Sequence, residues 1–129
     1  MNVVEYGDVV LYVLESGDVR PAQVVEVWDG KASYPLGTVN LSVFLDGGND
    51  RGRDSGIDDD MLLWATSVHF NLDKEPGTWH YREKDVQYTP YTDPSFGWAG
   101  VLRKPDGTVV AFVTPEGQMG FTREDIPSP

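Results

Sequence analysis

The sequence predicts an all-β fold built as one domain. Runs of β-branched, aromatic and leucine residues recur along the chain, and turn-forming residues separate them. The 14 glycines and 9 prolines are spread over the whole chain, as is typical of short strands joined by tight turns. No amphipathic pattern predicts a helix longer than two turns. Because 129 residues are enough for one core only, we expect residues 1–129 to fold as a single domain.

The first three strands are expected at residues 8–14, 22–28 and 38–45. The first is almost continuously apolar, and Glu15-Ser16-Gly17-Asp18 supplies a turn after it. The second has valines between polar residues and ends before Asp29-Gly30. In the third, apolar and polar residues alternate, which predicts a half-buried strand.

A long exposed loop is expected at residues 46–60, which are rich in Asp and Gly and have almost nothing to bury. The β pattern resumes at residues 61–70 and 78–81, which predict the fourth and fifth strands. Aromatic residues and prolines are mixed between residues 82 and 96. A residue before proline is pushed from helical to extended geometry, so this segment is expected to be an extended crossover.

The C-terminal third predicts a three-stranded meander. Its strands are expected at residues 97–103, 108–114 and 118–122. Pro105-Asp106-Gly107 and Pro115-Glu116-Gly117 lie between them, each with a proline preset for the start of a turn and a glycine free to take positive φ.

Composition excludes several classes of function. Ten basic and 21 acidic residues give a net charge of −11, which disfavours direct nucleic-acid binding because counterion release rewards positive surfaces. The lack of cysteine excludes disulfide frameworks and thiolate metal sites. No apolar run is long enough to span a membrane, and the first residues lack the pattern of a signal peptide. We therefore expect neither a membrane partner nor secretion by a signal peptide.

Motifs for catalytic or metal chemistry are weak. His69 and His80 lie on neighbouring predicted strands without a chelating spacing, so packed sheet residues are favoured over a metal site. Ser67 lies near His69 without the nucleophile elbow of a hydrolase. The acidic loop fails the ligand spacing of an EF-hand, and no P-loop is present. Paired carboxylates stay open, because acidic residues are plentiful and no pair is singled out. We expect no enzyme, no catalytic residue, no metal and no cofactor.

Aromatic residues in the middle of the chain provide the candidate binding surface, since such side chains are enriched at the energetic centres of protein interfaces. The candidates for contact with a protein partner are Trp79, Tyr88, Tyr91, Phe96 and Trp98. The acidic loop is expected to supply solubility or electrostatic selection of a basic partner. Its candidate residues are Asp46, Asp50, Asp54, Asp58, Asp59 and Asp60.

The order of elements in residues 1–81 resembles a small SH3-like barrel. Gly7-Asp8 leads into the first strand, a valine-rich second strand ends at Trp28, a third continues into Asp46-Gly47, and two short strands complete the set. The resemblance implies an SH3-like small barrel followed by the crossover at 82–96 and a C-terminal β meander at 97–129. A fold by itself implies no function.

A narrower resemblance, to small proteins of tailed bacteriophages and prophages, rests on three sequence segments. They are residues 7–14 (Gly-Asp-Val-Val-Leu-Tyr-Val-Leu), residues 39–47 (Val-Asn-Leu-Ser-Val-Phe-Leu-Asp-Gly) with Asn49-Asp50, and residues 64–70 (Trp-Ala-Thr-Ser-Val-His-Phe) with Pro76-Gly77-Thr78-Trp79-His80. The resemblance implies a non-enzymatic phage accessory protein that acts by protein–protein recognition, in the virion or in the host cytoplasm.

Three functions follow from this resemblance. The favoured one is a virion protein, such as a head decoration or tail accessory protein, that forms a homo-oligomer or assembles on a repeating surface. The alternative is an inhibitor of a host defence system, acting as an acidic mimic or by sequestering a nucleotide signal. A small hydrolase or metal-dependent enzyme built around His69 and His80 is a third, of a different class.

Overall fold

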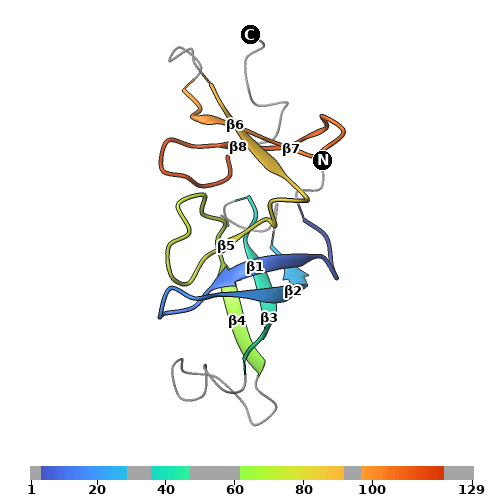
Figure 1. The fold of residues 1–129 in the computed structure, drawn as a ribbon, viewed down its shortest axis with the longest axis vertical. Coiled ribbons are helices and arrows are strands. Elements are labelled where there is room, and N and C mark those ends of the chain that lie inside the picture. The colour runs from blue at the N-terminus through green and yellow to red at the C-terminus, as the bar shows by residue number, and fades with distance from the viewer. Residues whose placement is uncertain (1–3, 29–35, 47–61, 92–96, 121–129) are drawn as a thin grey trace.

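The computed structural model describes residues 4–28, 36–46, 62–91 and 97–120, and this part of the chain is all-β (Figure 1). A five-stranded sheet has the order β4-β3-β2-β1-β5, and a three-stranded sheet has the order β6-β7-β8. Every pair of neighbouring strands in both sheets is antiparallel. No helix occurs in the described ranges. The fold class predicted from the sequence is confirmed.

The first sheet contains β1 (Val9–Val13), β2 (Val19–Val27), β3 (Val39–Phe44), β4 (Leu62–Val68) and β5 (Trp79–His80). All five were expected, but β2 begins before Pro21 rather than after it. The Val24 N–H donates to the Asp8 carbonyl beside β1. Up to the bulge after Val24, the backbone groups of even-numbered residues of β2 therefore point to β1, and the backbone of Pro21 points to β3. The pairing of Ala22 with Val43 places Pro21 opposite Phe44, where β3 ends, so its missing N–H costs the sheet no hydrogen bond.

The first sheet closes on itself through the residues that follow β4. Phe70 forms a parallel bridge with Trp79. The Trp79 N–H donates to the His69 carbonyl at 3.0 Å, and the Asn71 N–H donates to the Trp79 carbonyl at 3.0 Å. Because β5 also pairs with β1, hydrogen bonds run in a ring from β1 through β2, β3 and β4, then through residues 69–71 after β4, to β5 and back to β1. A sheet closed in this way is a small barrel.

A buried asparagine stabilises the bulge where the register between β3 and β4 shifts. The shift falls between Val39 and Leu41, and Asn40 lies at that point. The Asn40 Oδ1 atom accepts hydrogen bonds from the Ser67 N–H at 2.8 Å and from the Trp28 Nε1–H at 2.9 Å. A side-chain acceptor thus replaces the backbone acceptor that the bulge displaces.

Three tight turns share one geometry. Each has a glycine with positive φ: +92° at Gly17, +91° at Gly107 and +86° at Gly117. In each, the glycine N–H donates to the carbonyl three residues earlier, at Leu14, Lys104 and Thr114. This pattern is a type I turn followed by a left-handed residue, for which glycine has no steric cost. The two turns predicted in the C-terminal third are confirmed.

The second sheet contains β6 (Gln87–Pro90), β7 (Gly100–Arg103) and β8 (Val109–Val113). The meander therefore differs from the expected one. Its first strand, β6, lies within the segment predicted as a crossover, of which residues 87–90 are extended and pair with β7. Of the strand predicted at 118–122, the described residues show one isolated bridge between Met119 and Val113.

One hydrophobic core extends through both sheets. From the barrel it includes Val10, Leu41 and Trp79, and from the second sheet Leu102 and Ala111. A backbone hydrogen bond of 2.7 Å from Leu72 to Gly117 also joins the two parts. The barrel and the second sheet therefore pack as two layers on a shared interior.

Candidate functional site

The Trp79 side chain lies in the barrel core, so the prediction that it belongs to an exposed contact surface is wrong. It is 0% exposed, and its Nε1–H donates to the Gly37 carbonyl at 2.7 Å. Its ring packs edge-on against Phe70, with centroids 5.3 Å apart, and against Tyr81, with centroids 5.0 Å apart. Both residues of β5, Trp79 and His80, are buried, and the indole belongs to the hydrophobic core.

Of the other predicted aromatic residues, the structure describes Tyr88, Tyr91 and Trp98, and all three are half-buried. Tyr88 is half-buried on β6 and packs against the core. Tyr91 is half-buried beside a shallow depression of about 420 Å³ over β7 and β8. Trp98 is half-buried and packs on Phe112, with ring centroids 6.0 Å apart. Phe96 lies outside the described residues.

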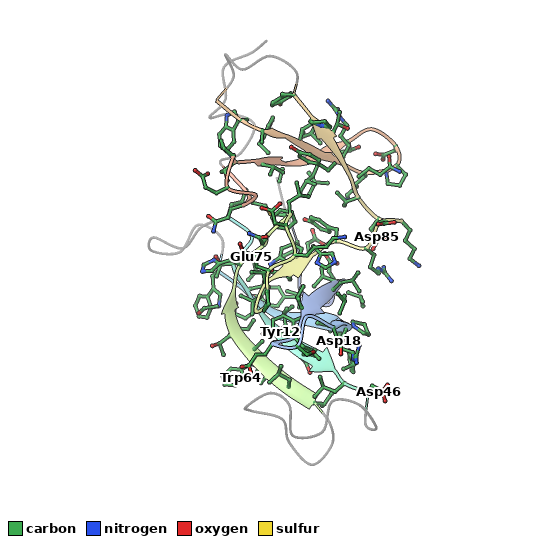
Figure 2. The ribbon with its side chains drawn as sticks, turned by 60° about the vertical axis from the view of Figure 1, so that its left-hand side comes forward. Tyr12, Asp18, Asp46, Trp64, Glu75 and Asp85 are labelled. Carbon is green, nitrogen blue, oxygen red and sulfur yellow. The ribbon has the colours of Figure 1, made fainter. Side chains whose placement is uncertain are left out.

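The predicted acidic loop follows β3 and precedes β4. Asp46 is exposed directly after the end of β3 (Figure 2). The other candidates, Asp50, Asp54, Asp58, Asp59 and Asp60, lie outside the described residues. Their charges belong to the segment that joins Asp46 to Leu62, so they are tethered to the ends of these two strands.

An exposed apolar surface lies on the outer side of β3 and β4, and we call it the Trp64 face. Trp64 is 66% exposed and Phe44 is 44% exposed. Trp64 pairs with Ser42 and Phe44 pairs with Leu62, so all four side chains lie on one side of the two strands. Figure 2 shows Trp64 on β4 and Asp46 at the end of β3. The Trp64 face is thus an exposed aromatic surface on the outer side of the sheet.

A cleft of about 500 Å³ lies between the barrel and the second sheet. Its apolar wall is formed by Leu11 from β1, Phe70 and Leu72 after β4, and Val86 and Leu102 from the opposite side. Its polar lining comes from three segments and comprises Lys74, His80, Tyr81, Glu83, Gln87 and Tyr88. An apolar wall with a few polar groups of different kinds is the usual composition of a small-molecule pocket.

His80 is the buried titratable group of this cleft. It is 7% exposed, and its Nδ1 atom is buried without a hydrogen-bond partner. Burial lowers the pKa of His80, the positive charge of Lys74 lowers it further, and the negative charge of Glu83 opposes the shift. The ring is therefore neutral at neutral pH.

The two histidines have different surroundings. The His69 Nδ1 atom lies 3.1 Å from the Thr38 hydroxyl, whereas His80 lines the cleft. Among the residues that the structure describes, no group of three or more His, Cys, Asp or Glu side chains has a geometry for holding a metal ion. Within the same ranges, no helix has the length and apolar character needed to cross a membrane.

No protein-family model matches the chain, and neither a curated protein nor a solved structure matches it. The candidate sites therefore stand on their geometry.

Sequence reasoning did not single out the exposed Trp64 face. Trp64 lies between the buried residues Leu63 and Ala65, and period-two alternation puts it on the opposite side from them. The alternation was visible in the sequence, but it did not say which side is buried. A tryptophan is larger than leucine or alanine, so it was the one more readily expected inside. The cleft left no signal, because its lining comes from segments far apart in the sequence.

Proposed function

We propose that this protein is a non-catalytic binding protein that recognises a basic protein surface through the Trp64 face. The observation that carries the proposal is the 66% exposure of Trp64 on a regular strand of the barrel. A large aromatic side chain loses favourable burial when it faces water, and tryptophan is enriched at the centres of protein interfaces. Phe44 beside it extends the apolar area, so the surface has the aromatic composition of an interface centre.

Charge specifies the partner. The segment between Phe44 and Leu62 carries Asp46, Asp50, Asp54, Asp58, Asp59 and Asp60, and the whole chain has a net charge of −11. An exposed apolar surface on a strongly acidic chain is complementary to a protein with an apolar recess and a basic rim. Nucleic acid is disfavoured as a partner, because its phosphates would be repelled.

The resemblance to small tailed-phage proteins supports a virion protein as this partner. In that setting the chain is a head decoration or tail accessory protein, and its binding surface is repeated over the particle. The closed strand order β4-β3-β2-β1-β5, with a very short fifth strand, supports the SH3-like type proposed for residues 1–81.

The test is mass spectrometry of purified virions from cells that produce the wild-type protein, the Trp64→Ala variant or the Tyr6→Ala variant. Tyr6 is 63% exposed but does not belong to the Trp64 face, so its variant is a matched control. We expect the wild type and Tyr6→Ala at a stoichiometric ratio to the major capsid protein, and Trp64→Ala reduced about tenfold or more, as for an interface hot spot.

Two other outcomes are informative. Equal recovery of all three proteins contradicts recognition through the Trp64 face. Absence of the wild type from virions contradicts the virion assignment, and a host protein whose direct affinity for the purified chain falls on Trp64→Ala would then identify an intracellular target. High salt should slow association with either partner, because the recognition is partly electrostatic.

A further inference from the structure

The cleft between the barrel and the second sheet has two opposite charges at its edge. Lys74 comes from the connection between β4 and β5, and Glu83 comes from the connection between β5 and β6. Both lie close enough to His80 to act on its pKa, with opposite signs. Within the described ranges neither side chain forms an ion pair, so both charges are available to a ligand.

His80 adds a neutral hydrogen-bond donor to this lining. Its Nδ1 atom is buried without a partner, and a buried N–H without an acceptor is more costly than a buried lone pair. This difference favours the tautomer with the ring proton on Nε2, and His80 is one of the residues that line the cleft. An oxygen acceptor of a ligand would satisfy that N–H.

An edge strand of the second sheet lies beside the cleft. In the described part of the chain, β6 pairs with β7 only, so it is an edge strand, and its residues Gln87 and Tyr88 line the cleft. Edge strands have unpaired backbone N–H and C=O groups that recruit extended peptides. Gln87 adds a side-chain amide that can pair with a peptide group.

We propose that the cleft binds a short apolar peptide with free termini, such as a di- or tripeptide. Lys74 takes the carboxylate, Glu83 takes the ammonium group, and the His80 N–H donates to a peptide or carboxylate oxygen. The apolar wall of Leu11, Phe70 and Leu102 accepts the side chains. The volume of about 500 Å³ lies within the range of pockets that hold ligands of this size.

Peptide binding is measured by NMR titration of the full-length protein with the dipeptide Phe-Leu, its N-acetyl form, its C-terminal amide and free phenylalanine. We expect saturable shifts at His80 and Tyr88 with Phe-Leu. Blocking either terminus should weaken binding by about tenfold, as expected for the loss of a charge-assisted hydrogen bond. The histidine nitrogen shifts should show the proton of His80 on Nε2 before the peptide is added.

Two variants identify which residue binds each terminus of the peptide. Lys74→Met should bind Phe-Leu and its amide equally, and Glu83→Gln should bind Phe-Leu and its N-acetyl form equally. Lys84→Met is the control, because Lys84 is exposed next to Glu83 and does not line the cleft. It should keep the wild-type preference for free termini. Unchanged thermal unfolding would show that each variant is folded.

The proposal is overturned if no form of the peptide gives saturable shifts at millimolar concentration, or if blocked and free termini bind equally to the wild type. It is also overturned if free phenylalanine binds as tightly as Phe-Leu, which would assign the cleft to amino acids. Trp64→Ala does not touch this cleft and should leave the titration unchanged. Failure of the Trp64 face and failure of the cleft are therefore distinguishable.

Discussion

Replacement of Trp79 by phenylalanine tests whether the barrel depends on the indole that closes it. The indole is fully buried, and its N–H donates to the Gly37 carbonyl at 2.7 Å. Phenylalanine removes that donor, a loss of about 1 kcal/mol for a buried hydrogen bond. The smaller ring also leaves a cavity beside Phe70 and Tyr81, which costs about another 1 kcal/mol.

We therefore expect Trp79→Phe to lower the free energy of unfolding by about 2 kcal/mol, with a fall in Tm of roughly 8 °C for a chain of this length. The assay is urea denaturation followed by circular dichroism, with a thermal scan as a second measure. Trp64→Phe is the control, because the exposed indole at that position should change stability by less than about 0.5 kcal/mol. If the two substitutions changed the free energy of unfolding equally, the conclusion that the barrel depends on the buried Trp79 indole would be refuted.

Three further substitutions or conditions have defined outcomes. Asn40→Ala removes the acceptor of two hydrogen bonds at the bulge and should destabilise the protein by about 2–3 kcal/mol in the same urea assay. Gly120→Ala would place a Cβ 1.6 Å from the Trp98 ring and should cost about 1–3 kcal/mol of stability, and an unchanged Tm would contradict the close packing of Trp98 on Gly120. The pKa of His80 is lower in the folded protein than its ordinary value of 6.5, so the unfolded chain binds more protons at mildly acidic pH. The His80 contribution to stability is complete above pH 6.5 and decreases as pH falls below it. Comparison of the wild type with His80→Gln between pH 7 and 5 isolates this contribution, and identical slopes would contradict it.

Local sequence signals predicted the barrel strands and the turns, because these depend on neighbouring residues. Gly107 and Gly117 follow proline in short turns, and only glycine takes their positive φ without strain. The strand β6 was missed because Pro90 ends it, and proline was taken as a sign of a crossover. Proline is compatible with an edge strand, and the sheet order that makes β6 an edge is a tertiary property.

The candidate sites were harder to predict than the fold. Both Trp64 and Trp79 lie in strands, and the difference between 66% and 0% exposure depends on which side of the barrel each faces. Alternation determines the relation between neighbours within a strand, but the buried side follows only from the register with other strands. The cleft requires the packing of two sheets, and no single segment of the sequence encodes it.

Because the cleft lies between the two sheets, its integrity depends on whether they unfold together. Met119, which follows β8, packs against Gly37 of the barrel so closely that a Cβ on Gly37 would lie only 2.6 Å from the Met119 Sδ atom. Met119 and Trp79 belong to the same hydrophobic core. A shared core predicts one cooperative unfolding transition. Single-tryptophan variants that retain Trp79 in the barrel or Trp98 in the second sheet should report the same transition.

A peptide bound in the cleft should then stabilise the whole chain, by about 2.7 kcal/mol at a concentration of 100 times Kd. If the Trp98 signal changes at a lower urea concentration than the Trp79 signal, the second sheet unfolds first. Peptide binding would in that case shift the Trp98 transition and leave the Trp79 transition where it was.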